Sequence, residues 1–271
     1  MCSRPCFSAA RDLPDSTCRR ILDGILNLVY PEECLLCGAP LVRQREYGIC
    51  RGCWAKALAL QIKPPVCACC GLPLPYYSED SESLCGRCLL NMPPFAGARS
   101  FGYYTAELSG VIRGFKFLGR RNLAGPLASL LALVFHDTWT RKEFDLIVPI
   151  PLHARRKRER GYNQSELLAR SLSGLAAVPC AKNVLVRTRP TLPQVGLSDA
   201  RRLENVRGAF RCPNPSRTAG KRILLIDDVM TTGATAGSAA LALLDAGALR
   251  VSMLTAARAV REAPAGKRLY F

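Results

Sequence analysis

The stretch that decides the fold of this chain is KRILLIDDVMTTGAT, residues 221–235. Its first six residues form a short apolar run of strand-forming side chains, which predicts a buried strand over 221–226. The residues after it predict a polar loop, a helix over about 236–246 that ends at Gly247, and a second strand over 250–255. Together these elements make a βαβ unit with a parallel sheet, whose ligand site is expected at the carboxyl ends of the strands.

Asp227 and Asp228 stand side by side at the end of the first strand. Two adjacent carboxylates repel each other unless a cation, a metal ion or hydroxyl donors compensate them, so the pair is suited to ribose hydroxyls or Mg²⁺. The residues after the pair have small or hydroxyl side chains and lead into a helix N-terminus, which makes a cradle for an anion. They are Val229, Met230, Thr231, Thr232, Gly233, Ala234 and Thr235. The alternative is an ordinary strand-to-helix turn capped by Asp and Thr. The sequence excludes a Walker A phosphate loop and a dinucleotide-binding site of the G-x-G-x-x-G type, because it lacks the glycine pattern of either motif.

The region upstream of this unit also has an α/β pattern, which begins after Pro93 and Pro94. Apolar spacing predicts helices over 108–117 and 123–135 and a buried strand over 144–150. A further helix is expected over 163–178, opened by Asn163 with a glutamate three residues later.

Cysteines in C-x-x-C pairs organise the first third of the chain. The pairs form two tetrads, C-x2-C-x12-C-x2-C and C-x2-C-x14-C-x2-C, made of Cys34, Cys37, Cys50 and Cys53 and of Cys67, Cys70, Cys85 and Cys88. Such spacing is typical of two closed, structural zinc sites; buried thiols and iron–sulfur ligation are the alternatives. Each C-x-x-C turn is called a knuckle. Because Cys69 stands beside Cys70, the ligand at the third knuckle is ambiguous. Glycines follow or interrupt the knuckles (Gly38, Gly52, Gly71 and Gly86), where a positive φ is often needed.

Composition limits the classes of protein to consider. The chain has 271 residues, 49% of them hydrophobic, and its 38 Lys and Arg against 21 Asp and Glu give a net charge of +17. This excess favours polyanionic partners such as nucleic acid or phosphorylated small molecules, with a merely basic surface as the alternative. No apolar run is long enough for a membrane span, and the first 17 residues lack the apolar region of a secretory signal, so we expect a cytoplasmic protein.

The run IDDVMTTGAT resembles the motif with which type I phosphoribosyltransferases bind 5-phosphoribosyl 1-pyrophosphate (PRPP). The wider pattern resembles the competence protein ComF family, which joins a zinc-ribbon module to a phosphoribosyltransferase-like domain. Further support comes from VPIPL at 148–152, RGYNQ at 160–164 and the stretches 194–197 and 202–210. The resemblance covers nearly the whole chain after about residue 17. It implies an α/β fold in which region 18–94 includes a double zinc ribbon and region 95–271 is a phosphoribosyltransferase-like parallel sheet with flanking helices. Residues 1–17 are expected to be disordered, and apolar spacing predicts a helix over 19–30 that ends before Pro31.

The resemblance also implies roles for residues. The acid pair would hold the ribose hydroxyls of PRPP with Mg²⁺, and residues 229–235 would hold its 5′-phosphate. A pyrophosphate loop and a flexible covering loop around 155–164 would include Pro151, Leu152, His153, Arg155, Arg160, Tyr162, Asn163 and Gln164. No catalytic residue or acceptor site is specified.

Two functions follow from these expectations. One is DNA uptake for natural transformation, with PRPP as ligand, single-stranded DNA as partner, and a helicase or channel as a further partner. The other is phosphoribosyl transfer from PRPP to a nucleobase or amine. DNA contacts are expected from basic groups at 155–160, at Arg201, Arg202, Arg207 and Arg211, and over 258–268, with stacking by Tyr47, Trp54, Tyr76 and Tyr77. Zinc removal is expected to unfold residues 34–88 and to leave the α/β domain folded.

Overall fold

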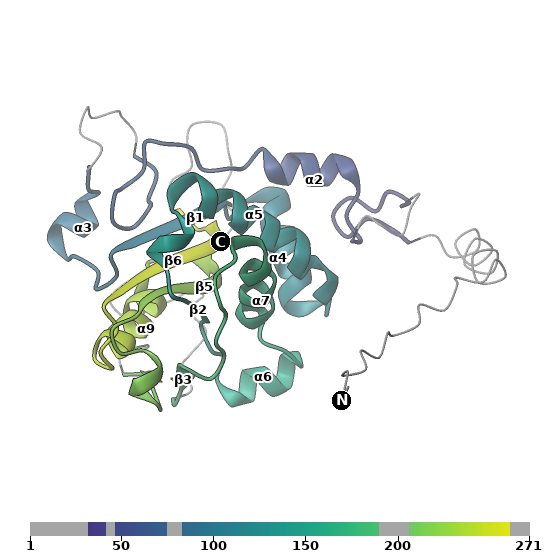
Figure 1. The fold of residues 1–271 in the computed structure, drawn as a ribbon. Coiled ribbons are helices and arrows are strands. Elements are labelled where there is room, and N and C mark those ends of the chain that lie inside the picture. Colours follow the sequence, from purple (N-terminus) through teal and green to yellow (C-terminus); the bar gives the residue numbers. More distant parts are fainter. Residues whose placement is uncertain (1–31, 42–46, 75–82, 190–205, 207, 261–271) are drawn as a thin grey trace, which may run out of the picture. The chain divides into compact units, whose positions relative to one another are not determined.

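The computed structural model describes residues 32–41, 47–74, 83–189, 206 and 208–260 (Figure 1). The α-helices are α2 (Arg51–Leu58), α3 (Gly86–Leu90), α4 (Ala106–Phe117), α5 (Ala124–Thr138), α6 (Ala154–Arg160), α7 (Gln164–Ala176) and α9 (Ala234–Leu244). The strands are β1 (Gly97–Tyr103), β2 (Leu146–Pro149), β3 (Val186–Arg187), β4 (Phe210–Arg211), β5 (Arg222–Met230) and β6 (Arg250–Arg258). Short 3-10 turns are Arg121–Leu123, Arg141–Glu143 and Pro215–Arg217.

The central sheet has the order β1-β6-β5-β2, and every neighbouring pair is parallel. Its strands are apolar over most of their length because both faces are covered, as is usual for parallel sheets. In the register of β5 and β6, Asp227 lies opposite Thr255 and Met230 opposite Arg258. The carboxyl ends of the strands therefore bring the acid pair to one edge of the sheet. β3 and β4 form a separate antiparallel pair.

Helices cover both faces of this sheet. The helices α5 and α7 pack against each other and against the strands on one face, and α9 packs on the other (Figure 1). Side chains of β5 alternate accordingly: Ile223 and Leu225 belong to the core beneath α9, together with Ala236 and Ala239 of that helix. This burial fixes the directions in which the side chains at the end of β5 point.

The second cysteine tetrad belongs to this same core. Cys67, Cys70, Cys85 and Cys88 are buried in one cluster with side chains of β5, β6 and α9. The chain before and within this tetrad also runs along the outer edge of β1. Cys69 O accepts from Ala98 N at 2.7 Å, Leu60 O accepts from Tyr103 N at 2.9 Å, and Ile62 N donates to Phe101 O at 2.8 Å.

The structure confirms the predicted helices over 108–117, 123–135 and 163–178 and the strand over 144–150, with shifts of a few residues at their ends. Three expectations were wrong. The strand predicted over 221–226 continues to Met230, so the acid pair lies on the strand and not in a loop. Residues 154–160 form α6 in place of a flexible loop. Gly52 and Gly86 lie in α2 and α3, whereas Gly38 and Gly71 have the expected positive φ.

Some expectations fall on residues outside the described ranges. They are the terminal segment 1–17, the helix over 19–30, the stretch 194–197, Tyr76, Tyr77, Arg201, Arg202, Arg207 and the basic residues beyond 260.

Candidate functional site

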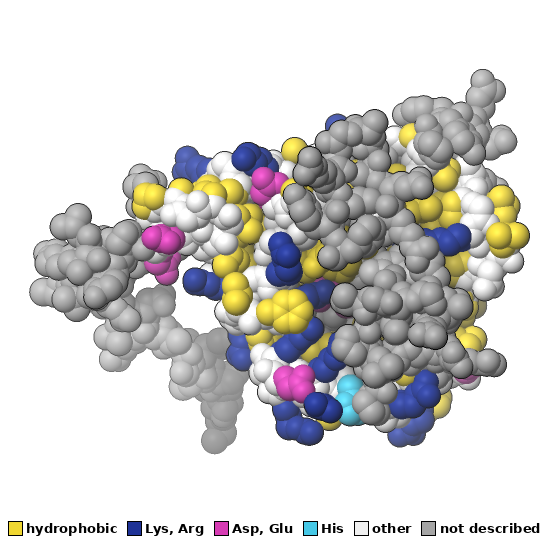
Figure 2. Space-filling model, turned by 180° about the vertical axis from the view of Figure 1, so that it is seen from behind, with side chains coloured by type: hydrophobic (Ala, Val, Ile, Leu, Met, Phe, Trp, Pro, Cys, Tyr) yellow, Lys and Arg dark blue, Asp and Glu magenta, His cyan; other side chains and the backbone are white. Residues whose placement is uncertain are grey.

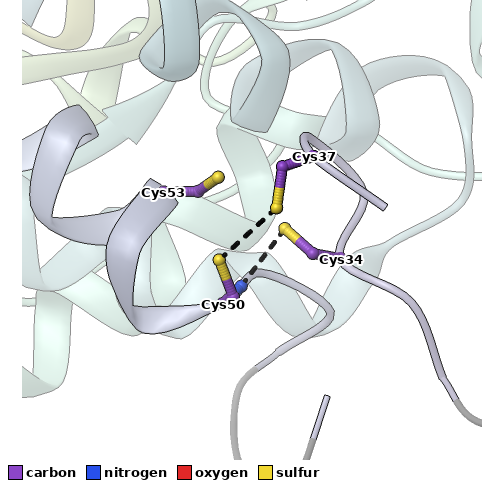
Figure 3. Close-up of side chains that lie close together, drawn as sticks. All are labelled: Cys34, Cys37, Cys50 and Cys53. Carbon is purple, nitrogen blue, oxygen red and sulfur yellow. Dashed lines mark hydrogen bonds between the residues drawn. The ribbon is translucent and has the colours of Figure 1, made fainter. Parts of the chain in front are cut away.

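The first cysteine tetrad brings four sulfur atoms together from two knuckles (Figure 3). Cys34 and Cys37 come from a turn, and Cys50 and Cys53 come from the start of α2. Cys37 Sγ lies 3.7 Å from Cys50 Sγ, and Cys50 N donates to Cys34 Sγ at 3.3 Å. Burial opposes ionisation of Cys34, but the N–H groups of Cys50, Leu36 and Cys37 outweigh it and lower its pKa to about 6. The tetrad is thus prepared to hold a cation through a thiolate.

The second tetrad repeats this arrangement with greater burial. All four of its cysteines are buried, whereas Cys37 of the first tetrad is exposed. Cys70 Sγ lies 3.6 Å from Cys85 Sγ, and Cys85 N donates to Cys67 Sγ at 3.3 Å. Burial again opposes ionisation, but amide hydrogen bonds lower the pKa of Cys67 to about 7.

Both tetrads fit zinc. Bonds of about 2.3 Å from a tetrahedral Zn²⁺ to sulfur place neighbouring sulfurs about 3.8 Å apart, and a disulfide would hold them at about 2.0 Å. The sulfur–sulfur distances of 3.7 and 3.6 Å match the zinc geometry, and all ligand atoms of each tetrad lie within 4.8 Å of one another. Cys70 and not Cys69 belongs to the tetrad, since Cys69 Sγ points to Phe95 O at 3.8 Å. The chain therefore has two zinc-binding sites, each made of four cysteines.

Two arginines face the second tetrad from the sheet. Arg258, at the end of β6, is 1% exposed and donates to Cys70 O at 2.6 Å and to Cys70 Sγ at 3.5 Å. Arg99 on β1 donates to Ala68 O at 3.0 Å. Burial lowers the pKa of both guanidinium groups, and the nearby thiols oppose this effect. A zinc ion with four thiolates carries a net negative charge, which these cations partly neutralise.

The acid pair at the end of β5 is neutralised from two helices. Lys116 Nζ, near the end of α4, lies 2.8 Å from Asp228 Oδ1. Ser165, in the first turn of α7, donates to Asp227 Oδ1 at 2.8 Å. Desolvation and the charge of Asp228 raise the pKa of Asp227 to about 7, although Lys116 and Ser165 act in the opposite direction. The two carboxylates therefore lie in a polar setting, with Lys116 and Ser165 beside them, of the kind that a cationic or hydroxyl-rich ligand would complete.

The chain turns sharply between the acid pair and α9. Gly233 has a φ of 86°, in the left-handed region that favours glycine. A Cβ there would also lie 2.9 Å from Met230 Cε, the end of a flexible side chain. Thr232 Oγ1 accepts from Ala234 N at 3.3 Å. A small pocket that is partly open to solvent lies at this turn, lined by Asp227, Val229, Thr231, Gly233 and Thr235 among others. Two threonines and the start of α9 thus border a space beside Asp227.

Most of the residues that were expected to contact pyrophosphate make hydrogen bonds or ion pairs within the protein. Pro151, Leu152 and His153 follow β2, and His153 caps α6 by accepting from Arg155 N at 3.3 Å. Arg155 pairs with Glu159 at 3.0 Å on the exposed surface.

The motif RGYNQ holds α4 and α7 in place. Tyr162 donates to Phe115 O, and Gln164 Nε2 donates to Lys116 O at 3.3 Å. Asn163 Nδ2 donates to Ile150 O at 3.1 Å, and its Oδ1 caps α7. Arg160 Nη1 donates to Gln164 Oε1 at 3.1 Å. These contacts set the position of Lys116 and Ser165, the two partners of the acid pair that the sequence analysis missed. No local signal marks Lys116, because it comes from a distant helix.

One predicted DNA contact is wrong. Arg258 is buried against the second tetrad, so it cannot meet a phosphate in solution. Arg211 and Tyr47 are exposed, and Trp54 is half-buried. Within the described residues, no helix has the length and apolar character needed to span a membrane.

Residues 25–89 match the double zinc ribbon domain. Among solved structures, the glutamine PRPP amidotransferase from B. subtilis is 20% identical, with 50% of this chain and 26% of that chain covered at a TM-score of 0.35. A purine phosphoribosyltransferase from Pyrococcus horikoshii is 12% identical, with 52% and 94% covered at a TM-score of 0.30.

Curated relatives match over much more of the chain. The DNA utilization protein YhgH of Escherichia coli (strain K12) is 36% identical over 229 residues, which cover 83% of this chain and 96% of the relative. Competence protein F of Haemophilus influenzae is 36% identical over 193 residues, covering 69% and 80%. Competence protein ComFC of Bacillus subtilis is 30% identical over 217 residues, covering 78% and 84%. With this identity over nearly the full length of its relatives, and with both cysteine tetrads in place, the chain belongs to the competence protein F (ComF) family.

Proposed function

We propose that this protein binds PRPP with Mg²⁺ at the end of β5 and acts on single-stranded DNA during DNA uptake. The observation that carries the first half is the pair Asp227 and Asp228, held at a strand end beside the turn into α9. The second half is supported by the names of the relatives, which refer to competence and DNA utilization. The net charge of +17 also suits a polyanionic partner.

The chemistry of PRPP matches the site part by part. Carboxylate oxygens accept hydrogen bonds from two neighbouring ribose hydroxyls, and they are also ligands that Mg²⁺ prefers. The 5′-phosphate suits the N–H groups at the start of α9 and the hydroxyl of Thr231, which lines the pocket. Bound Mg²⁺ would supply charge neutralisation for the pyrophosphate. A ligand on Asp228 has to share that carboxylate with Lys116 or displace it.

Calorimetry with and without Mg²⁺ tests PRPP binding. Replacing both Asp227 and Asp228 by Asn should weaken binding at least a hundredfold, because each charge-assisted hydrogen bond contributes about 1.5 to 3 kcal/mol. Asp245→Asn is the matched control, since this exposed acid lies at the far end of α9. Equal affinity in the wild type and the double variant would refute the assignment.

The pH dependence provides a second test of the same site. The pKa of Asp227 is raised to about 7, so Asp227 binds a proton between its ordinary pKa, near 4, and pH 7. A ligand that needs the ionised carboxylate should therefore bind more tightly as the pH rises from 6 to 8. For the free protein the sign is opposite: stability falls with rising pH in this window, because the folded state binds more protons than the unfolded state. Asp227→Asn should remove both effects, and a flat pH profile in the wild type would contradict them.

Single-stranded DNA binding is tested by anisotropy titrations at several salt concentrations. Contacts through phosphates should give a log–log salt slope of about −0.7 per neutralised phosphate. The variant with Arg155, Arg156, Lys157 and Arg158 changed to Ala should show a shallower slope. No binding at low salt would end the DNA proposal, and unchanged binding in the variant would move the contact surface away from α6.

Phosphoribosyl transfer is a second candidate function, favoured by Lys116, which pairs with Asp228 at 2.8 Å. Cations near a leaving pyrophosphate stabilise the charge that develops on it. Release of pyrophosphate from PRPP in the presence of adenine, guanine, uracil or ammonia measures this activity. PRPP binding without release under any of these conditions would leave ligand binding as the function of the site.

A further inference from the structure

We infer that the end of α4 is a stacking platform for unpaired bases of single-stranded DNA. The platform consists of Phe117 and Leu118, and its basic rim consists of Arg113, Arg120, Arg121 and Arg160. This inference rests on the proposed binding of single-stranded DNA and assigns it a surface. That surface differs from the zinc-ribbon aromatics expected from the sequence.

Two large apolar side chains are exposed together at this helix end. Phe117 is 64% exposed and Leu118 is 60% exposed, although the neighbouring Phe115 is fully buried. The guanidinium of Arg160 lies 4.9 Å from the centroid of the Phe117 ring. The ring thus already takes part in the cation–π contact that accompanies base stacking in proteins that bind single strands. Figure 2 shows Lys and Arg side chains interspersed with exposed hydrophobic side chains on the uncovered part of one face.

The platform is held rigidly from below. Tyr162 donates to Phe115 O, and Gln164 donates to Lys116 O, so the last turn of α4 is fastened to the segment after α6. Arg121 completes the connection, since its Nη2 donates to Gly161 O at 3.3 Å and its guanidinium lies 4.7 Å from the ring centroid of Tyr162. A fixed aromatic surface loses little conformational entropy when a ligand stacks on it.

The charge around the platform stays positive when ion pairs with nearby acids are taken into account. Arg113 lies one helical turn before Phe117 on the same face of α4, and Arg120 and Arg121 follow it; all three are exposed. The acids of adjoining described segments already face other cations. Glu159 pairs with Arg155, Asp228 with Lys116, and Glu107 with Lys56. The rim therefore attracts phosphate groups to the edge of an apolar surface.

This combination favours a single strand over a duplex. Bases in a duplex are already stacked on each other, so an exposed ring gains nothing from them, whereas an unpaired base offers its face. The rim supplies phosphate contacts without sequence preference. An anionic lipid surface also carries phosphates, and it serves as the competing outcome in the test.

The test measures binding of a labelled oligothymidylate and of an oligonucleotide of equal length made only of abasic sites. Phe117→Ala should weaken binding to oligothymidylate at least fivefold and leave binding to the abasic strand unchanged, because only the former can stack. Leu241→Ala is the matched control, since Leu241 is a 52% exposed apolar side chain on α9. Phe117→Trp should keep the affinity and show fluorescence quenching on binding. Arg113→Ala with Arg120→Ala should reduce the salt slope by about 1.4, at about 0.7 for each lost phosphate contact.

The outcomes separate this inference from the broader proposal. If the wild type binds oligothymidylate and Phe117→Ala binds equally well, the platform is refuted and DNA binding stands. An equal loss on the abasic strand also refutes stacking. Binding to vesicles of anionic phospholipid that Phe117→Ala abolishes, with DNA affinity unchanged, would assign the surface to membranes. No binding of either strand by the wild type at low salt would overturn both proposals.

Discussion

The two cysteine tetrads share a ligand pattern and differ in what surrounds them. In both, the third cysteine donates its N–H to the sulfur of the first, and the sulfurs of the second and third cysteines lie 3.7 and 3.6 Å apart. The first tetrad has an exposed cysteine, Cys37, whereas all four cysteines of the second are buried. The second also has two arginines of the sheet against it, and it lies within the core of β5, β6 and α9. The spacing therefore predicts a metal site without predicting how much of the protein depends on it.

The largest expected effect comes from removing one ligand of each tetrad. Cys70→Ser should lower the melting temperature of the α/β region by about 10 °C or more, because the second zinc site is part of its core and structural zinc binding is largely folding free energy. Cys37→Ser should lose one equivalent of zinc and leave that transition within a few degrees. Calorimetry and metal analysis measure both. If neither variant lowered this melting temperature, the tetrads would not differ, and the expectation that zinc removal leaves the α/β domain folded would hold. If both lowered it by 10 °C or more, the α/β region would depend on both sites.

The next effect concerns Arg258, whose buried charge lies against the second tetrad. Arg258→Met should destabilise the protein by about 3 to 5 kcal/mol, because it removes the buried one of the two arginines that face the thiolates and leaves Cys70 O without its donor. Arg250→Met, at the exposed start of β6, should stay within about 0.5 kcal/mol of the wild type. Urea unfolding gives both values. A neutral result for Arg258→Met would mean that the charge of the zinc site is compensated elsewhere.

A pair of glycines offers a smaller, closely matched comparison. Gly38 and Gly71 each follow a knuckle with φ near 70°, but a Cβ on Gly38 meets nothing within 4 Å and one on Gly71 would lie 2.3 Å from Ala98 O. Gly38→Ala should cost about 1 to 2 kcal/mol from its left-handed backbone alone. Gly71→Ala should cost about 2 to 5 kcal/mol, since strand β1 must also move. Equal costs in thermal unfolding would show that the knuckle and β1 separate easily.

The smallest effect is kinetic. A chelator should remove zinc in two phases, with the first tetrad losing its ion about tenfold faster because Cys37 is open to solvent. Release from the second tetrad requires local opening of a buried core. Absorbance of a coloured chelator follows the release, and Cys37→Ser should abolish the fast phase. A single phase for both ions would contradict the difference in accessibility.

Sequence reasoning succeeded where the geometry is local. A C-x-x-C knuckle brings two sulfurs together by itself, so the spacing alone identified both tetrads. The position of the acid pair after an apolar run was also predictable. The end of β5 was not, because the strand is prolonged to Met230 by pairing with β6, and Ala259 N donates to Met230 O. Such pairing depends on residues far away in the chain.

Lys116 and Arg258 show a second kind of contact that the sequence does not predict. Each is a basic residue that composition counts toward a positive surface, yet each faces a specific negative partner. Asp228 meets Lys116 only because α4 is held against the segment after α6. Cys70 meets Arg258 only because the turn with Cys67 and Cys70 lies over the end of β6. Charge counts contain no information on such partners. The roles of the acid pair and of residues 151–164 toward PRPP stay predictions.

The segment over residues 60–71 also affects the solubility of the protein. β1 is the last strand on its side of the central sheet, and a bare outer strand can pair with another copy of the same protein. Here the backbone of Leu60, Ile62 and Cys69 already occupies hydrogen-bonding groups along that strand. The chain that leads into the second metal site, together with Cys69 within that site, thus also shields the sheet from intermolecular pairing. Protein that loses this ion should be prone to aggregate through β1, so metal supply during synthesis would govern the yield of soluble protein.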